Sequence, residues 1–215
     1  MGAAPLGDAL EAGRVLFSHD CTFIAGAATL DALPPPVLPE AAFAGRSNAG
    51  KSSLLNALTG RAQLARVSAT PGRTRQINFF QIAGRLMLAD LPGYGFARAS
   101  KAEAARWNAL AFGYLRDRPN LRRVILLIDA RRGLMKADLE TMGILDKAAV
   151  SYQIVLTKSD LVMPERLAAV SAATRAASSR HGAAHPEIVA TSASTGLGIA
   201  ELRAELAALA APPAP

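Results

Sequence analysis

The sequence predicts an α/β fold, with a doubly wound, mostly parallel sheet of six strands that includes one antiparallel strand. The first observation behind this prediction is that short apolar runs, typical of buried strands, alternate along the chain with segments of helical periodicity. The second is that one strand-to-helix junction, at residues 45–52, carries the glycine-rich pattern G-x-x-x-x-G-K-[ST]. Such sheets bind ligands beyond the carboxyl ends of their strands, so functional residues are expected where strands end.

Six apolar runs are interpreted as strands: residues 41–44, 77–82, 86–89, 124–128, 152–156 and 187–190. The second and third are separated only by Ala83, Gly84 and Arg85, and two strands joined by so short a turn must be antiparallel. Helices are expected over residues 53–58, 101–117, 136–148, 164–179 and 198–210. Trp107, in the second of these helices, is interpreted as a core residue.

The N-terminal residues 1–39 show no strong helical period and are expected to form an arm that ends in a proline-rich connector. The connector, Leu-Pro-Pro-Pro-Val-Leu-Pro at residues 33–39, is interpreted as a stiff spacer, because proline fixes the backbone and donates no hydrogen bond. One nucleotide-binding domain is expected over residues 40–210, followed by a short tail at residues 211–215.

Composition limits the class of protein. No apolar run of about 18 residues is free of charge, so no membrane span is expected. The single cysteine, Cys21, excludes an internal disulfide and a cysteine-rich metal site, and a cytoplasmic monomer is expected. The net charge of +7 favours contact with nucleic acid, although an arginine-rich and alanine-rich composition can also reflect a GC-rich genome.

The glycine-rich junction predicts a phosphate-binding loop. Its residues are Gly45, Arg46, Ser47, Asn48, Ala49, Gly50, Lys51 and Ser52. The two terminal glycines allow the backbone to wrap around phosphate oxygens, and the loop amides and the helix N-terminus direct partial positive charge at the anion. Lys51 is expected to reach the β- and γ-phosphates, and the Ser52 hydroxyl to ligate Mg²⁺. The alternative, a glycine-rich turn with a solvated lysine, does not require this strand-to-helix context.

A second box, Asp90, Leu91, Pro92 and Gly93, follows the strand at residues 86–89. A carboxylate at this position can hold Mg²⁺, directly or through water, as a Walker-B aspartate does. The Gly93 amide can bond the γ-phosphate and report its loss. The alternative is an ordinary turn, since the pattern D-x-x-G is short.

The base is expected to be read by a third box, Thr157, Lys158, Ser159 and Asp160, after the strand at residues 152–156. Guanine presents two adjacent donors that one carboxylate can accept, whereas adenine presents an acceptor that would repel Asp160. Lys158 can lay its aliphatic stem over the purine. A final box, Thr191, Ser192 and Ala193, follows the last strand and is expected to contact the guanine oxygen through its backbone. The alternative for the third box is a helix N-cap.

These four boxes, in this order, resemble those of P-loop NTPases with a Ras-like domain that bind GTP. The finer text resembles the EngB (YihA/YsxC) family of Era-like, TRAFAC-class bacterial GTPases: Thr-Pro-Gly-Arg-Thr at residues 70–74, Asp-Leu-Pro-Gly-Tyr-Gly at 90–95, Ile-Asp-Ala-Arg at 128–131 and Thr-Lys-Ser-Asp at 157–160. The resemblance covers about residues 14–207. It implies a role in assembly of the large (50S) ribosomal subunit, with ribosomal RNA and ribosomal proteins as partners, and links to cell division and septation.

The resemblance also implies that Thr74 is the second Mg²⁺ ligand, in a mobile first switch. Its neighbours Gly72, Arg73, Arg75 and Gln76 would then cover the γ-phosphate. Thr70 is a competing ligand that spacing alone does not separate from Thr74. Asn48 resembles the asparagine that binds K⁺ in potassium-stimulated relatives, or it simply stabilises the loop.

Many GTPases place a water-orienting glutamine directly after the D-x-x-G glycine, but here that residue is Tyr94. Slow intrinsic hydrolysis is therefore expected, with acceleration by K⁺ or a ribosomal partner. Two other classes compete with this interpretation. A metabolic P-loop kinase would lack the guanine box, and a regulatory GTPase of the septum or membrane would carry an anchor or a further helical domain.

Overall fold

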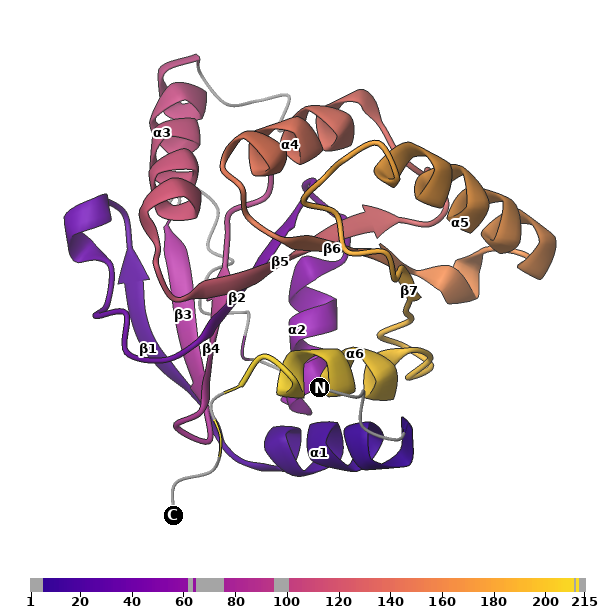
Figure 1. Ribbon diagram of the computed structural model, residues 1–215, viewed down its shortest axis with the longest axis horizontal. Helices are drawn as coiled ribbons and strands as arrows, with labels where there is room; N and C mark the ends of the chain where they lie inside the picture. The colour runs from indigo at the N-terminus through magenta and orange to yellow at the C-terminus, as the bar shows by residue number, and fades with distance from the viewer. Residues whose placement is uncertain (1–5, 62–63, 65–75, 95–100, 211, 213–215) are drawn as a thin grey trace.

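The computed structural model describes residues 6–61, 64, 76–94, 101–210 and 212, with backbone alone at residues 101–108. Figure 1 shows a central sheet with helices on both sides. The sheet has seven strands in the order β1-β3-β4-β2-β5-β6-β7. The strands are β1 (Cys21–Ala27), β2 (Glu40–Gly45), β3 (Ile77–Ile82), β4 (Leu86–Asp90), β5 (Leu121–Asp129), β6 (Tyr152–Thr157) and β7 (Val189–Ala190).

One strand, β3, runs against the others, as expected, because it pairs antiparallel with both β1 and β4 while the remaining pairs are parallel. The turn from β3 to β4 places Ala83 at φ 53° and Gly84 at φ 64°, and the Arg85 amide donates to the Ile82 carbonyl. Two successive positive φ values are typical of the tight turn that matches the twist of a two-stranded hairpin. The predicted α/β fold class is thus confirmed.

The sheet has seven strands rather than six because the N-terminal region is part of it. Helix α1 (Leu6–Ser18) and edge strand β1 lie where the sequence predicted no helix and only an arm. Gly13 of α1 lies so close to α6 that an added Cβ would stand 2.6 Å from the Ala204 nitrogen. A glycine in a helix reads as a weak position from sequence, whereas here it permits close packing of two helices. Strand β1 was missed because only its first and last residues are buried, so it has no alternating pattern.

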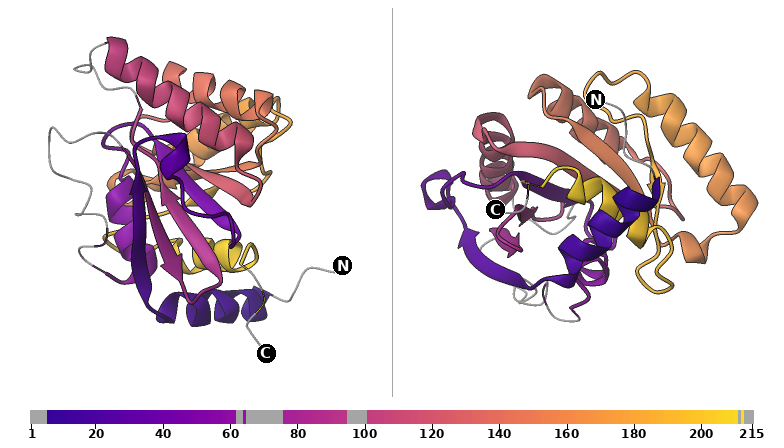
Figure 2. Two further views of the ribbon diagram at one scale, coloured as in Figure 1. Left: turned by 90° about the vertical axis from the view of Figure 1, so that its left-hand side faces the viewer. Right: turned by 60° about the horizontal axis from the view of Figure 1, so that its bottom comes forward.

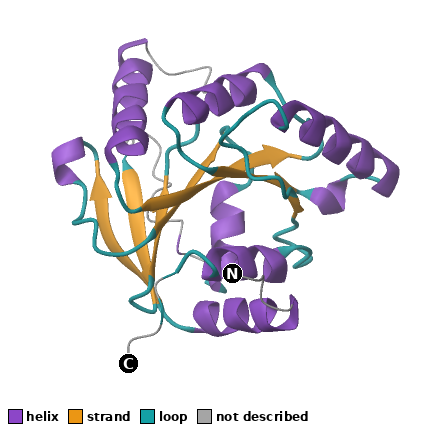
Figure 3. Ribbon diagram, viewed as in Figure 1, coloured by secondary structure: helices purple, strands orange, loops and turns teal. Residues whose placement is uncertain are grey.

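Each remaining helix lies close to its expected range. They are α2 (Lys51–Thr59), α3 (Lys101–Asp117), α4 (Lys136–Lys147), α5 (Pro164–Ser178) and α6 (Ile199–Ala207), and short 3₁₀ turns lie at Leu30–Ala32 and Ser159–Leu161. Figures 2 and 3 show the sheet enclosed between helices. The side chain of Trp107 lies outside the described residues.

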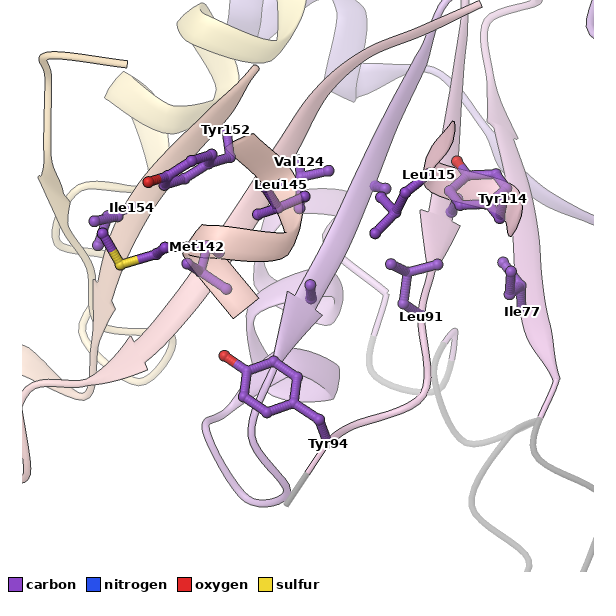
Figure 4. Packing of buried hydrophobic residues seen from close by; sticks show 14 of the residues in the cluster. Ile77, Leu91, Tyr94, Tyr114, Leu115, Val124, Met142, Leu145, Tyr152 and Ile154 are labelled. Atoms are coloured by element: carbon purple, nitrogen blue, oxygen red, sulfur yellow. The ribbon is translucent and has the colours of Figure 1, made fainter. Parts of the chain in front are cut away.

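Two hydrophobic clusters, one on each face of the sheet, explain this arrangement. Along β5, Val124, Leu126 and Ile128 point into the cluster with α3, α4 and α5. The intervening Ile125 and Leu127 point into the cluster with α1, α2 and α6. Successive side chains of a strand face opposite ways, so a continuous apolar run is buried on both sides. Figure 4 shows part of the first cluster.

The first cluster also encloses polar groups that are paired. The Tyr114 hydroxyl on α3 donates to Oε2 of Glu40 at 3.0 Å, and Arg118 Nε donates to the same oxygen at 2.9 Å. Buried charge is tolerated when it is paired and hydrogen-bonded in this way. On the other face, burial raises the pKa of the Cys21 thiol to about 11, so this cysteine is expected to be an inert packing residue.

Candidate nucleotide-binding site

The four boxes meet at one edge of the sheet. Strands β2, β4, β5, β6 and β7 are parallel neighbours, and each box begins at or just after the carboxyl end of one of them. Parallel strands bring their carboxyl ends to the same edge, which is where ligands of open α/β sheets bind. Residues far apart in the chain are therefore adjacent here, as the sequence predicted for this class of fold.

The phosphate-binding loop leaves β2 at Gly45 and enters α2 at Lys51. Asn48 has φ 66° and Gly50 has φ 91°, so the loop uses the left-handed region twice within three residues. A Cβ on Gly45 would stand only 3.0 Å from the Leu127 Cβ and 3.1 Å from the Leu127 carbonyl oxygen. Glycine adopts such turns and close approaches with the least strain, and the result is a concave row of backbone amides at a helix N-terminus.

Lys51 and Asp90 form an ion pair at the mouth of this loop. The Lys51 ammonium is bonded to Oδ1 of Asp90, and the two side chains are only 13% and 3% exposed. Lys51 is the first residue of α2 and Asp90 is the last residue of β4, so two different elements supply the pair. A shielded ammonium at a helix N-terminus is well placed to meet phosphate charge. The Ser52 side chain, one residue further, is exposed.

The D-x-x-G loop continues the pairing of β4 alongside the phosphate-binding loop. The Leu91 amide donates to the Phe43 carbonyl at 3.0 Å, and the Tyr94 amide donates to the Gly45 carbonyl at 3.1 Å. A Cβ on Gly93 would stand 3.2 Å from both the nitrogen and the Cα of Ser47. Gly93 therefore lies directly against the phosphate-binding loop, a position that a larger residue would force apart.

The third box is bonded to the same loop. Lys158, at φ 57°, donates from Nζ to the Asn48 carbonyl at 2.6 Å, and Thr157 donates from Oγ1 to the Ala49 carbonyl at 2.6 Å. Many GTPases have asparagine where Thr157 stands, and its hydroxyl acts here as a donor to the loop. These bonds join the base-reading box to the phosphate-reading box, so the two are expected to act as one unit.

The carboxylate of Asp160 is exposed and accepts a hydrogen bond from Ser194 Oγ at 2.9 Å. A hydrogen bond from Ser192 holds the pKa of Asp160 below its usual value, and the Ser194 bond acts in the same direction. Asp160 therefore remains ionised across the neutral range, as a group that accepts the two guanine donors must be.

The final box lies beside the third. Ser159 donates to the Thr191 carbonyl from its amide at 3.1 Å and from its hydroxyl at 2.8 Å. Ser192 is buried and Ala193 is exposed. After them, Gly198 at φ 69° lies so close to Ala190 that a Cβ would stand 2.0 Å from its carbonyl oxygen. The close turn holds residues 191–193 against the base-reading box.

Asp129, at the end of β5, was not assigned a role from sequence although the structure places it in the site. Its Oδ2 accepts from Lys158 Nζ at 3.0 Å, and its two oxygens accept from Arg131 at 2.9 and 2.7 Å. Burial by itself would raise the pKa of Asp129, but the hydrogen bonds from Arg131 and Lys158 outweigh it and lower the pKa. The available signal was its position, because Asp129 ends its strand as Asp90 ends β4.

We expect Asp129→Asn to weaken GDP and a GTP analogue equally, by about tenfold or more, because a hydrogen bond between two charged groups contributes roughly 1.5–3 kcal/mol. The amide carries no charge to hold the Lys158 ammonium, and Lys158 is expected to contact the base rather than the γ-phosphate. Titration with fluorescent nucleotides measures both affinities. Asp146→Asn is the matched control. Asp146 lies near the C-terminal end of α4, where its carboxylate is hydrogen-bonded to His181 and to the Ala183 amide. A loss confined to one nucleotide would contradict this role.

A pocket of about 350 Å³ opens beside the phosphate-binding loop on the side of α4. Its lining includes Arg46, Asp129, Arg131, Arg132 and Asp138. The Arg46 Nε is buried and has no hydrogen-bond partner among the described residues. The pocket therefore lies between the end of β5 and the start of α4, next to the phosphate-binding loop.

The first switch lies outside the described residues. This applies to Gly72, Arg73, Thr74 and Arg75, and also to the competing Thr70. Gln76, at the described edge of this segment, donates from its side-chain Nε2 to Asn78 Oδ1 at 2.8 Å. Among the described residues, no group of three or more His, Cys, Asp or Glu side chains could hold a metal ion, and no helix there is long and apolar enough to span a bilayer.

Comparison with known proteins agrees with this geometry. Residues 40–158 match a protein-family model described as "50S ribosome-binding GTPase". The chain is 56% identical over 207 residues to the "Probable GTP-binding protein EngB" of Granulibacter bethesdensis, covering 96% of this chain and 93% of that protein. It is 55% identical over 203 residues to the protein of the same name from Gluconobacter oxydans, covering 94% and 89%.

Solved structures show the same fold. A crystal structure described as a probable GTP-binding protein EngB has a TM-score of 0.64 and 23% identity, covering 79% of this chain and 97% of that one. The structure of Era in complex with MgGDPNP and nucleotides 1506–1542 of 16S ribosomal RNA has a TM-score of 0.62 and 22% identity, covering 83% of this chain and 58% of that one. At these identities the likeness concerns the fold alone.

Proposed function

This chain belongs to the EngB family of GTP-binding proteins, and on that premise we propose that it is a cytoplasmic, GTP-hydrolysing switch in assembly of the large ribosomal subunit. GTP binding and general GTPase character follow from family membership. The role in assembly of the large ribosomal subunit is proposed here, and so is a role in cell division and septation. The supporting facts are the family description as a 50S ribosome-binding GTPase and the net charge of +7.

The observation that carries the proposed nucleotide site is the bonding of the base box to the phosphate loop. Lys158 and Thr157 donate to the carbonyls of Asn48 and Ala49, and the ionised Asp160 stands beside them. We assign guanine recognition to Asp160 and phosphate binding to Lys51 with the loop amides. Residues 191–193 complete the base pocket through their backbone.

The oxygen donors next to the loop fit a magnesium ion. Mg²⁺ prefers oxygen ligands, and the Ser52 hydroxyl and Asp90 carboxylate are both of this kind, on adjacent ends of α2 and β4. We assign Ser52 as a direct ligand, Asp90 as a ligand through water and Thr74 as the ligand from the first switch. When bound, the ion would neutralise phosphate charge.

We propose that hydrolysis is slow in the isolated protein. Tyr94 takes the place of a water-orienting glutamine, and its hydroxyl is bonded to Asp138. The missing contribution would come from K⁺ held by the exposed Asn48 or from the ribosomal partner. The catalytic roles left to the chain are charge stabilisation by Lys51, metal binding by Thr74 and γ-phosphate contact by the Gly93 amide.

We propose that the first switch presents its basic residues to ribosomal RNA only when GTP orders it. Arg73 and Arg75 belong to this segment of the sequence, and Arg66 lies near it. Contact with phosphates releases counterions, so binding of this kind weakens as salt rises. For three contacts to single-stranded RNA, affinity is expected to fall about 20-fold between 50 and 200 mM salt.

Sedimentation of the protein with purified ribosomal subunits tests the proposal. We expect binding to the large subunit to be tighter with a GTP analogue than with GDP, and to weaken with salt as above. Turnover is expected to rise when subunits are added, or when K⁺ replaces Na⁺. Binding that depends on neither the nucleotide nor the salt concentration would contradict the switch. Sedimentation of the protein with membranes instead of subunits would favour a septal or membrane-associated GTPase.

A further inference from the structure

The Tyr94 side chain crosses from the D-x-x-G loop to helix α4. It is only 8% exposed, and its hydroxyl donates to Oδ1 of Asp138 at 2.8 Å. Figure 4 shows the ring among the buried side chains, with its hydroxyl toward the region of Met142 on α4. A tyrosine hydroxyl that is fully committed to a buried carboxylate is not free to orient water. The residue that replaces the glutamine is therefore available for a different task.

Asp138 is a costly residue for this position. It is 1% exposed, in the first turn of α4, and its second oxygen accepts from the Met135 amide at 2.9 Å. Burial raises the pKa of Asp138, although the bonds from Met135 and Tyr94 and the nearby charge of Arg46 oppose this. An exposed residue would cap the helix equally well, so the cap alone does not explain why this carboxylate is buried against Tyr94.

The backbone of Tyr94 is held as firmly as its side chain. Its amide donates to the Gly45 carbonyl at 3.1 Å, and its carbonyl accepts from the Ser47 amide at 3.0 Å. Tyr94 is thus bonded to the phosphate-binding loop on one side and to α4 on the other. Gly93, which precedes it, lies so close to Ser47 that an added Cβ would stand 3.2 Å from the Ser47 nitrogen and Cα.

We propose that Tyr94 and Asp138 are positioning residues that hold the Gly93 amide in place for the γ-phosphate. The inference rests on the proposed role of that amide. Because only the γ-phosphate meets this loop, a loop held in advance favours the triphosphate and leaves GDP binding unaffected. Pre-ordering a contact raises affinity by removing the entropy that would otherwise be lost on binding.

Tyr94→Phe tests the proposal, because it removes only the hydroxyl. The measured quantity is the ratio of the dissociation constants for a non-hydrolysable GTP analogue and for GDP. We expect this ratio to rise by about two- to tenfold, the range for the net contribution of one hydrogen bond, with the GDP affinity unchanged. Asp138→Leu, which removes the acceptor, is expected to raise the ratio equally.

The double variant, Tyr94→Phe with Asp138→Leu, separates positioning from stability. Replacing both partners by apolar groups can restore stability, but it does not restore the bond, so the ratio is expected to stay at the single-variant value. Tyr114→Phe is the matched control, since it removes another buried phenol-to-carboxylate bond in the same cluster. It is expected to lower the melting temperature without changing the ratio.

An unchanged ratio in Tyr94→Phe or in the double variant would overturn the proposal, as would an equal rise in Tyr114→Phe. Nucleotide binding by the wild-type protein distinguishes failure of the positioning role from failure of the nucleotide-site assignment. If the wild-type protein binds guanine nucleotides and the ratio does not move, only the positioning role is rejected. If one single variant does not fold, the other single variant and the double variant report the same ratio.

Discussion

Lys51→Ala is expected to lower the affinity for both GTP and GDP by about 100-fold or more. The ammonium is 13% exposed beside a carboxylate that is 3% exposed, at the N-terminus of α2. Removing it deletes the side-chain cation of the phosphate-binding loop that is assigned to the phosphates and leaves Asp90 buried without its counter-charge, so that the carboxylate repels the ligand. Truncating one partner of a buried, hydrogen-bonded charge pair at a binding interface typically costs roughly 2–5 kcal/mol of binding free energy. Calorimetric titration with each nucleotide measures the loss.

Lys136→Ala provides the matched control for this substitution. Lys136 also begins a helix, α4, but its side chain is 92% exposed and its ion pair with Glu140 spans 3.9 Å. Exposed pairs of this kind contribute little, so nucleotide affinity is expected to remain unchanged. If Lys51→Ala bound either nucleotide within threefold of the wild type, the phosphate role of this lysine would be rejected.

The positions of the boxes could be predicted from sequence because they depend on local patterns. A continuous apolar run such as residues 124–128 is typical of a strand buried on both faces, and the end of such a strand marks the binding edge. The same reasoning located the ends of β4 and β6. The turn at Ala83 and Gly84 was also decided locally, since no other chain direction fits so short a connection.

Helix α1 and strand β1 could not be predicted from the local sequence, because the residues against which they pack are distant in the chain. The contact of Gly13 with Ala204 joins residues nearly 200 positions apart, and no periodicity within residues 1–39 announces it. Asp138 is a similar case. From sequence it is an acidic residue in the first turn of a helix, where acids are common on the surface, and only the tertiary contact with Tyr94 reveals its burial.

Both the base-reading box and the D-x-x-G loop are hydrogen-bonded to the phosphate-binding loop. It accepts hydrogen bonds from Lys158 and Thr157 on the base side, and it pairs with Tyr94 on the γ-phosphate side. This arrangement gives the two largest expected effects their distinct signatures, with loss of all nucleotides at Lys51 and a change of base preference at Asp160.

Asp160→Asn is expected to reduce GTP affinity by about 100-fold and to make xanthosine triphosphate the preferred ligand. The ionised carboxylate accepts both guanine donors, whereas an amide offers one acceptor and one donor, which suits the altered edge of xanthine. Two charge-assisted hydrogen bonds at roughly 1.5 kcal/mol each account for this magnitude. Competition between the two triphosphates measures the switch, with Asp117→Asn, at an exposed aspartate paired to Arg116, as the control. Tight GTP binding by Asp160→Asn, without a gain for the xanthine nucleotide, would assign base recognition to other residues.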